Sequence, residues 1–218
     1  MIYHRGRHIQ VRGRIVGILL CGLLALSGTG TASAREDEDN SFGGRLSLKV
    51  NHDFKNGIYV TQGFKHDNYQ FNRLRCFYSR TSVGYRVLPW LKFGVNYVPV
   101  LNSDRTWSHF AELDLTGSLK SGNFNVSVRE RYRRGLSSAT NELRSRLKVV
   151  YSIPDSQFGV FLAPEVYTWG TEWKKTRHYV GFTYDILEFM QMECFYIYYV
   201  HRDRPEEHIV GLGLNFNF

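Results

Sequence analysis

The sequence predicts an all-β protein, an antiparallel up-and-down transmembrane β-barrel that follows a signal peptide. About eleven runs of roughly ten residues alternate apolar and polar side chains, which is the length a tilted strand needs to cross a bilayer. The N-terminus reads as an export signal, and the chain ends on an apolar strand whose last residue is Phe218. No stretch after the signal resembles a membrane-spanning helix, so any membrane role would have to use strands.

The first 34 residues are predicted to be a secretory signal peptide. Residues 1–14 carry four arginines and no acid, residues 15–26 form an apolar core, and Ala32-Ser33-Ala34 matches a cleavage site. The alternative is an N-terminal membrane anchor, but the apolar core is too short to span a bilayer comfortably. Cleavage after Ala34 would leave an acidic leader at residues 35–43 and a barrel at residues 44–218.

Removal of the signal halves the excess of positive charge. The whole chain has 28 basic and 20 acidic residues and a net charge of +8. The signal holds four of the arginines, so 24 basic residues remain against 20 acidic ones. We therefore predict no nucleic-acid partner. Only Cys76 and Cys194 remain after cleavage, and the sequence does not decide whether they pair.

The first half of the predicted barrel contains five alternating runs. They span residues 44–54, 58–66, 71–86, 91–97 and 107–119. Tight turns are predicted at Lys55-Asn56-Gly57 and Leu88-Pro89-Trp90. In the third run the alternation changes phase near residues 79–81, which predicts a β-bulge at that point.

The second half contains six further runs. They span residues 124–135, 141–152, 158–168, 175–186, 190–201 and 207–218. The run at 190–201 is so aromatic that its two faces cannot be assigned. Tight turns alternate with longer polar links along the chain, which is typical of a transmembrane barrel.

The number of strands is not settled by this count. Bacterial single-chain barrels have even strand numbers, whereas eleven runs are visible. A short strand at residues 41–45, or a division of the third run at its bulge, would give about twelve strands, and ten is the fallback. A secreted β-sandwich is the alternative fold, because its strands alternate in the same way.

The most informative stretch is the predicted hairpin at residues 124–152. If its loop closes near Arg134 and Asn141, Arg129 faces Arg146, Arg131 faces Arg144, and Arg133 faces Glu142. Like charges placed opposite one another destabilise a sheet, so neighbouring strands must supply acids. The predicted lumen charge network, or anion lining, comprises Arg129, Arg131, Arg133, Arg144, Arg146, Lys148, Arg177, Glu112, Asp114, Glu142 and Glu165.

Two interpretations of this network stay open. It can be a structural set of ion pairs that fills a narrow lumen and fixes register. It can also be a basic track that concentrates small anionic solutes in an open pore, by analogy with small barrels that conduct acidic oligosaccharides. The excess of cations favours anions if the lumen conducts. Glu130 falls on the apolar face, and we expect it near the outer headgroup rim.

From about residue 44 to residue 218 the chain resembles an uncharacterised family of bacterial outer-membrane barrels, domain of unknown function 2490. The matching residues are Arg129-Glu130-Arg131-Tyr132, Arg144-Ser145-Arg146-Leu147-Lys148, Tyr151, Ile153-Pro154, Glu165, Tyr167, Arg177, Gly181 and His208-Ile209-Val210-Gly211. The resemblance implies a barrel in the bacterial outer membrane and implies no activity. The links here are shorter than that family's, which argues against an elaborate site built on loops.

An enzyme on the barrel rim, such as a lipid hydrolase or acyltransferase, is the remaining alternative. Ser108 and His109 are adjacent in sequence, so their side chains would point to opposite faces of a strand. Arginines opposite Glu112 and Asp114 would keep both acids ionised, which argues against a catalytic acid pair. We assign no catalytic residue, cofactor or metal, and expect a monomer whose partners are outer-membrane lipid and small anionic solutes.

Overall fold

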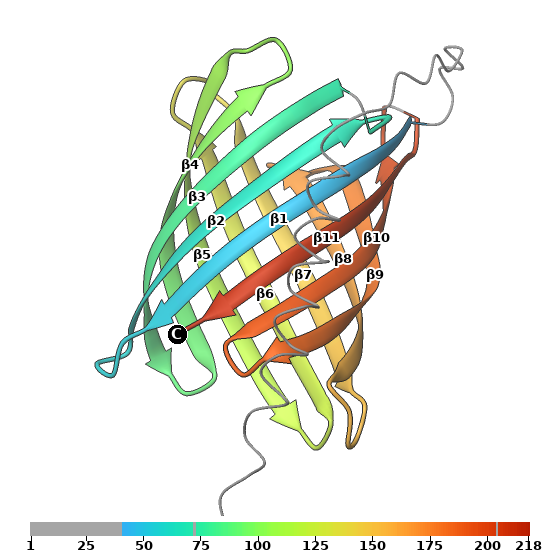
Figure 1. Cartoon of the computed structure of the whole chain (residues 1–218). Coiled ribbons are helices and arrows are strands. Elements are labelled where there is room, and N and C mark those ends of the chain that lie inside the picture. Colours follow the sequence, from blue (N-terminus) through green and yellow to red (C-terminus); the bar gives the residue numbers. More distant parts are fainter. Residues whose placement is uncertain (1–40, 72, 204) are drawn as a thin grey trace, which may run out of the picture. The chain divides into compact units, whose positions relative to one another are not determined.

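The computed structural model describes residues 41–71, 73–203 and 205–218, which form one closed β-barrel (Figure 1). The predicted signal peptide and residues 35–40 of the leader lie outside the described residues. The strands are β1 (Ser41–Asp53), β2 (Ile58–Tyr69), β3 (Arg73–Leu88), β4 (Leu91–Asn102), β5 (Trp107–Ser121), β6 (Phe124–Gly135), β7 (Asn141–Ser152), β8 (Phe158–Trp169), β9 (Glu172–Leu187), β10 (Met190–His201) and β11 (Glu207–Asn217). Among the described residues no helix is long and apolar enough to cross a membrane.

Closure of the barrel explains how an odd number of strands is accommodated. Sequential strands pair antiparallel, whereas β1 and β11 run in the same direction and pair in parallel, with Ser41 opposite Glu207 and Asn51 opposite Asn217. The predicted all-β barrel is confirmed, and its eleven strands lie between the expected twelve and the fallback of ten. Residues 41–43, which we had placed in the leader, are the first residues of β1.

The predicted bulge near residues 79–81 is wrong. The pairing of β2 with β3 is continuous from Ile58 opposite Tyr85 to Asp67 opposite Cys76, and the register shifts only beyond Asp67. Cys76 and Tyr78 lie on the lumen face, where they pack with Val98 and Val100 of β4. The apparent change of phase therefore arises because the lumen itself contains apolar side chains.

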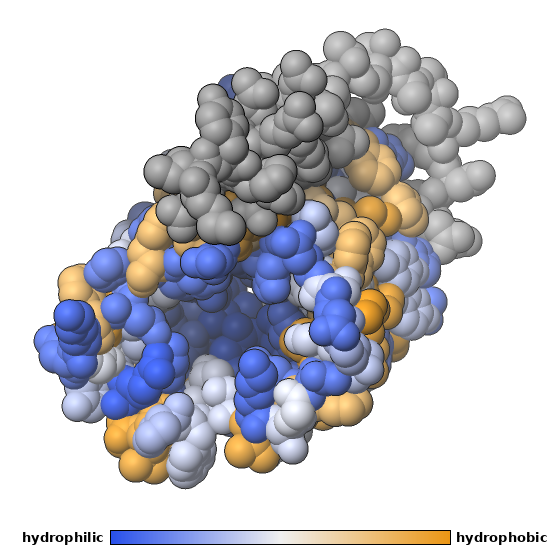
Figure 2. Space-filling model, turned by 60° about the horizontal axis from the view of Figure 1, so that its bottom comes forward, coloured by the Kyte–Doolittle hydropathy of each residue, from blue (hydrophilic) through white to orange (hydrophobic). Residues whose placement is uncertain are grey.

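The two faces of the barrel wall differ in chemistry. Successive side chains of a strand point to opposite faces, so each strand contributes to the outer surface and to the lumen. Val83, Leu115 and Val160 are exposed on the outside, whereas Glu112 and Arg131 are buried inside. Figure 2 shows a hollow lined by hydrophilic residues at one end of the barrel, beside hydrophobic residues on the outer wall.

Short links join the strands at both ends of the barrel. The C-terminus lies at the lower end in Figure 1, together with the turn between β1 and β2. In that turn Gly57 has φ +86°, and its N–H donates to the Phe54 carbonyl at 3.0 Å. The Asn56 side chain accepts from the Ile58 N–H at 3.1 Å. The predicted turn at residues 55–57 is confirmed, and its left-handed residue is the glycine.

Candidate functional site

The β6–β7 hairpin has the register that the sequence predicts. Arg129 pairs with Arg146, Arg131 with Arg144, and Arg133 with Glu142. All of these side chains are on the lumen face, because the alternate positions of both strands hold the exposed apolar side chains of the outer surface, such as Val128 and Leu147. The hairpin therefore brings a column of guanidinium groups into the barrel, and neighbouring strands must supply the counter-charges.

Glu112 on β5 is a counter-charge for three arginines at once. Its carboxylate lies 2.6 Å from the Arg133 guanidinium, 2.9 Å from Arg80 Nη2 and 3.4 Å from Arg131 Nε. The residue is 1% exposed. Arg131 also binds Asp114 bidentately, from Nε to Oδ1 and from Nη2 to Oδ2, both at 2.5 Å. One buried carboxylate therefore serves three arginines, and a second holds one of them in a fixed orientation.

Glu165 on β8 is shared in the same way. It lies 2.8 Å from Arg129 Nη2 and 3.7 Å from Arg177 Nη1, and it accepts a hydrogen bond from the Tyr167 hydroxyl at 2.9 Å. The Arg177 guanidinium stacks on the Tyr167 ring at 4.4 Å from its centroid. Tyr167 is fully buried, so this part of the lumen is packed rather than open.

The remaining predicted residues fall into two groups. Arg144 forms an ion pair with Glu142, and Lys148 forms one with Glu193 of β10 at 2.9 Å. Arg146 has no carboxylate within ion-pair distance among the described residues, and its guanidinium lies over the Tyr179 ring at 4.9 Å. We call ten of the inward-facing charged residues of β5–β9 the arginine wall: Glu112, Asp114, Arg129, Arg131, Arg133, Glu142, Arg144, Arg146, Glu165 and Arg177.

Sequence reasoning missed the charged residues of the opposite wall. Arg45 of β1 binds Asp67 of β2 bidentately, with both N–O distances 2.6 Å. Arg75, the extra residue at the β2–β3 register shift, pairs with Glu207 of β11. These charges stand singly among apolar or polar neighbours, so no column of like residues marks them. The period-two alternation of β1 and β2 was the one pattern in the sequence that could have placed Arg45 and Asp67 on the lumen face.

Lys49 and Lys65 differ from every other cation described so far. Both are on the lumen face, because they occupy the same parity as Arg45 in β1 and Asp67 in β2. Their side chains are nevertheless exposed, and neither has an ion-pair partner among the described residues. An inward-facing side chain can be exposed only where the lumen holds space for water.

The lumen as a whole carries excess positive charge. Away from the turns at both ends of the barrel, the described inward-facing residues include thirteen cations and seven carboxylates. The cations are Arg45, Lys49, Lys65, Arg75, Arg80, Arg129, Arg131, Arg133, Arg144, Arg146, Lys148, Lys175 and Arg177. The carboxylates are Asp67, Glu112, Asp114, Glu142, Glu165, Glu193 and Glu207. Cations therefore outnumber carboxylates on the described inner wall, so part of the positive charge is not neutralised there.

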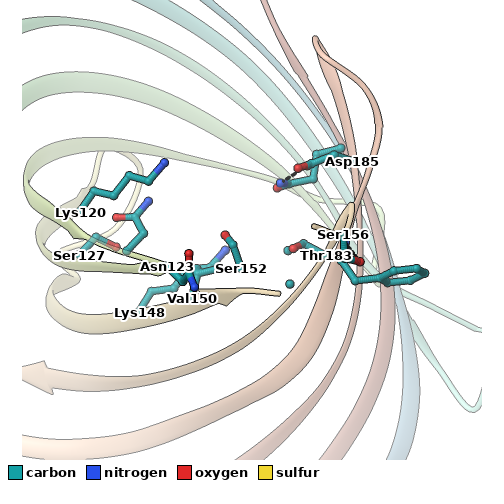
Figure 3. Close-up of a pocket in the computed structure, with 13 residues that line it drawn as sticks. Lys120, Asn123, Ser127, Lys148, Val150, Ser152, Ser156, Thr183 and Asp185 are labelled. Carbon is teal, nitrogen blue, oxygen red and sulfur yellow. Dashed lines mark hydrogen bonds between the residues drawn. The ribbon is translucent and has the colours of Figure 1, made fainter. Parts of the chain in front are cut away.

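A cavity of about 290 Å³ occupies the lower end of the lumen (Figure 3). In Figure 3, Lys120, Asn123 and Lys148 lie on one side of it, and Thr183 and Asp185 lie on the other. Its full lining is Lys120, Asn123, Asn125, Ser127, Lys148, Val150, Ser152, Ser156, Phe158, Gly159, Thr183, Asp185 and Gln191. Hydroxyl and amide groups dominate, so the cavity can hydrogen-bond a polar solute from several directions.

The arrangement expected of a hydrolase is not assembled by the described residues. Ser108 accepts a hydrogen bond from Asn102 at 2.9 Å on the lumen side, while His109 contacts the Tyr97 hydroxyl at 2.7 Å on the outside. Thr176 and His178 form a hydroxyl–imidazole pair at 3.3 Å on the outer wall. No acid orients that imidazole among the described contacts, and a nucleophile needs such a third group.

The structure shows where the two cysteines and Glu130 lie. Cys76 faces the lumen and Cys194 the outside, and both thiols are free. Glu130 points outward, as predicted, but lies near the middle of β6 rather than at its end. Its carboxylate accepts a hydrogen bond from the Ser145 hydroxyl at 2.6 Å, which satisfies part of its polarity on an otherwise apolar surface.

The barrel is similar in fold to a solved porin. The structure described as the NanC porin in a rhombohedral crystal form matches with a TM-score of 0.53 and 16% sequence identity, and the match covers 76% of this chain and 91% of that one. No protein-family model matches the chain. No curated protein matches it either. The resemblance to domain of unknown function 2490 therefore stays a prediction, whereas the closed, porin-like β-barrel is established.

Proposed function

We propose that this protein is a narrow, water-filled channel of the bacterial outer membrane that favours anions. The observation that carries the proposal is the exposure of Lys49 and Lys65 inside the barrel. Charged side chains that face a lumen without an ion-pair partner need water around them. The similarity to a porin fold supports the same conclusion.

The preference for anions follows from the excess of inward-facing cations. Fixed positive charges in a narrow lumen with low-dielectric walls raise the local concentration of anions and repel cations. The ion pairs of the arginine wall cancel much of its charge, so the field in the lumen is set mainly by the uncompensated groups. Lys49, Lys65 and Arg146 are three of these.

The location in the outer membrane is part of the proposal. An outer surface covered by exposed apolar residues would face lipid, and the predicted signal peptide would direct export. The resemblance to the outer-membrane family agrees with both features.

A more specific solute class is an acidic oligosaccharide. The cavity at the lower end of the lumen favours it, because amide and hydroxyl side chains line that cavity beside Lys120. Its carboxylate, Asp185, already accepts a hydrogen bond from Gln191 at 2.7 Å. The hydroxyl groups of a sugar acid match the amides and hydroxyls, and its carboxylate matches Lys120.

Reversal potentials across planar bilayers in a KCl gradient would test the channel. We expect a steady current that favours chloride over potassium. Lys65→Glu should shift the reversal potential toward cation preference, because it reverses an unpaired lumen charge. Arg134→Glu is the matched control, since Arg134 adjoins Arg133 but points to the outer surface, and it should leave the reversal potential unchanged.

A closed structural barrel is the competing function. The near-complete burial of Glu112, Tyr167 and Tyr199 favours it, because these side chains fill part of the lumen. Absence of conductance from folded protein would overturn the channel and support this alternative. Release of fatty acid from phospholipid by the purified barrel would instead support an outer-membrane lipid hydrolase or acyltransferase.

A further inference from the structure

A bare patch of the lumen wall lies at Gly63, in the middle of β2. Gly63 pairs laterally with Lys49 of β1 and with Arg80 of β3, so all three share the lumen face. Lys65 follows two residues later on the same face of β2. Glycine has no side chain, so the wall at this position is bare backbone. Three cations surround it.

The space at this position is real. A Cβ added at Gly63 would meet nothing closer than the backbone oxygens of Leu48 at 3.9 Å and Arg80 at 4.0 Å. Both distances are ordinary van der Waals contacts. Lys49 and Lys65 are also exposed, so the patch faces open space within the lumen.

The carboxylates that act on the two lysines are already paired with other cations. The acids that act most strongly on Lys65 and Lys49 are Asp67 and Glu193, respectively. Asp67 is held bidentately by Arg45, and Glu193 is held by Lys148. Among the described residues the only carboxylate paired with the patch is therefore Glu112, which Arg80 shares with two other arginines.

Arg80 is close enough to both lysines to act on them electrostatically, and one of its own hydrogen-bond donors has no acceptor. It is among the cations that act on both Lys49 and Lys65. Its Nη2 shares Glu112 with two other arginines, and its buried Nε has no hydrogen-bond partner. A buried guanidinium N–H without an acceptor is costly, and an anion that reached it would relieve that cost.

We propose that Lys49, Lys65 and Arg80 form an oxyanion-binding station around Gly63, which holds the carboxylate or phosphate group of a passing solute. We call this set the Gly63 station. It rests on the proposed channel function and deepens it, because it identifies where the solute's charged group would pause. The bare glycine lets the oxyanion approach the wall, and the two ammonium groups and the guanidinium supply the donors.

Equilibrium binding of inorganic phosphate and of acetate to the detergent-solubilised protein tests the station. Phosphate is followed by the ³¹P line width, and acetate by its competition with phosphate. Lys49→Gln removes one donor and its charge. Gly63→Leu fills the bare patch and keeps every charge. Lys92→Gln is the matched control, because Lys92 is also on the lumen side but lies at the lower end beside Asp53 at 3.3 Å.

The wild-type protein and Lys92→Gln should bind phosphate alike. Lys49→Gln and Gly63→Leu should each raise the half-saturation concentration by about tenfold or more, the loss expected for a charge-assisted hydrogen bond. Displacement of phosphate by acetate would identify a general oxyanion site, whereas phosphate binding alone would restrict the station to phosphate groups. The proposal is overturned if the wild type does not bind phosphate, or if both variants bind as tightly as the wild type does.

The bilayer measurement separates this proposal from the channel itself. Anion-favouring current without phosphate binding would reject the station and leave the channel function standing. Phosphate binding that both variants weaken, in a barrel that carries no current, would reject the channel and leave the Gly63 station as an oxyanion-binding site without transport.

Discussion

The arginine wall and the Gly63 station are both cationic, but they are built in opposite ways. In the arginine wall Glu112 and Glu165 are shared among several guanidinium groups, and Arg131 is only 4% exposed. In the station Lys49 and Lys65 are exposed and have no ion pair among the described residues. The first arrangement suits a structural role in fixing strand register, whereas the second leaves charge available to the solute that we propose. The abundance of positive residues therefore does not by itself locate the functional charge.

The largest expected effect comes from Glu112→Gln. The substitution keeps the side-chain volume but removes the negative charge that Arg80, Arg131 and Arg133 share. Arg131 keeps Asp114, but Arg80 and Arg133 lose their ion pair, which should lower the free energy of unfolding by about 3 kcal/mol or more. A urea titration of protein folded in phospholipid vesicles, followed by tryptophan fluorescence, measures this loss. Glu188→Gln in the exposed β9–β10 turn is the control, and similar losses for both variants would contradict a structural arginine wall.

A smaller effect is expected for Tyr167→Phe. The ring and its stacking with Arg177 remain, but Glu165 loses the hydrogen bond that it accepts at 2.9 Å. The expected loss in the free energy of unfolding is about 1 kcal/mol, the usual net value of one such bond. Tyr151→Phe on the outer wall serves as the comparison, because its hydroxyl has no hydrogen bond among the described contacts, and it should unfold like the wild type. Equal losses in the two variants would show that the Tyr167 hydroxyl contributes nothing.

Arg146→Gln sharpens the boundary between the two regions. Arg146 belongs to the arginine wall by position, but it faces Arg129 and has no ion pair among the described residues. Loss of its cation–π contact with Tyr179 and relief of repulsion from Arg129 should nearly cancel. The free energy of unfolding should change by less than about 0.5 kcal/mol. A loss as large as that of Glu112→Gln would mean that Arg146 is structural after all.

A similarly small effect on stability is expected for Lys65→Gln. An exposed lysine without an ion pair contributes little to folding, so the free energy of unfolding should stay within about 0.5 kcal/mol of the wild type. The same variant should reduce the preference for chloride in the bilayer measurement. A large loss of stability with an unchanged reversal potential would reverse the roles assigned to the two regions.

Much of the barrel follows from local patterns in the sequence. Period-two alternation gives the two faces of β6 and β7, and the short link between them fixes the register that places Arg131 opposite Arg144. Alternation was ambiguous only where the lumen is apolar. Cys76 and Tyr78 in β3, and Phe195 and Ile197 in β10, are inward-facing residues of this kind, and they led to a false bulge and an unassigned strand.

The amino-acid sequence alone determined the barrel class, the faces of most strands and the arginine column, because each depends on residues that are neighbours in the chain. Only the tertiary structure decided the parallel closure of β1 on β11, since that contact joins segments more than 150 residues apart. It also decided which cations are neutralised. Arg131 and Lys65 look alike in the sequence, but the strands that close around them supply a carboxylate to Arg131 and leave Lys65 exposed without an ion pair among the described residues.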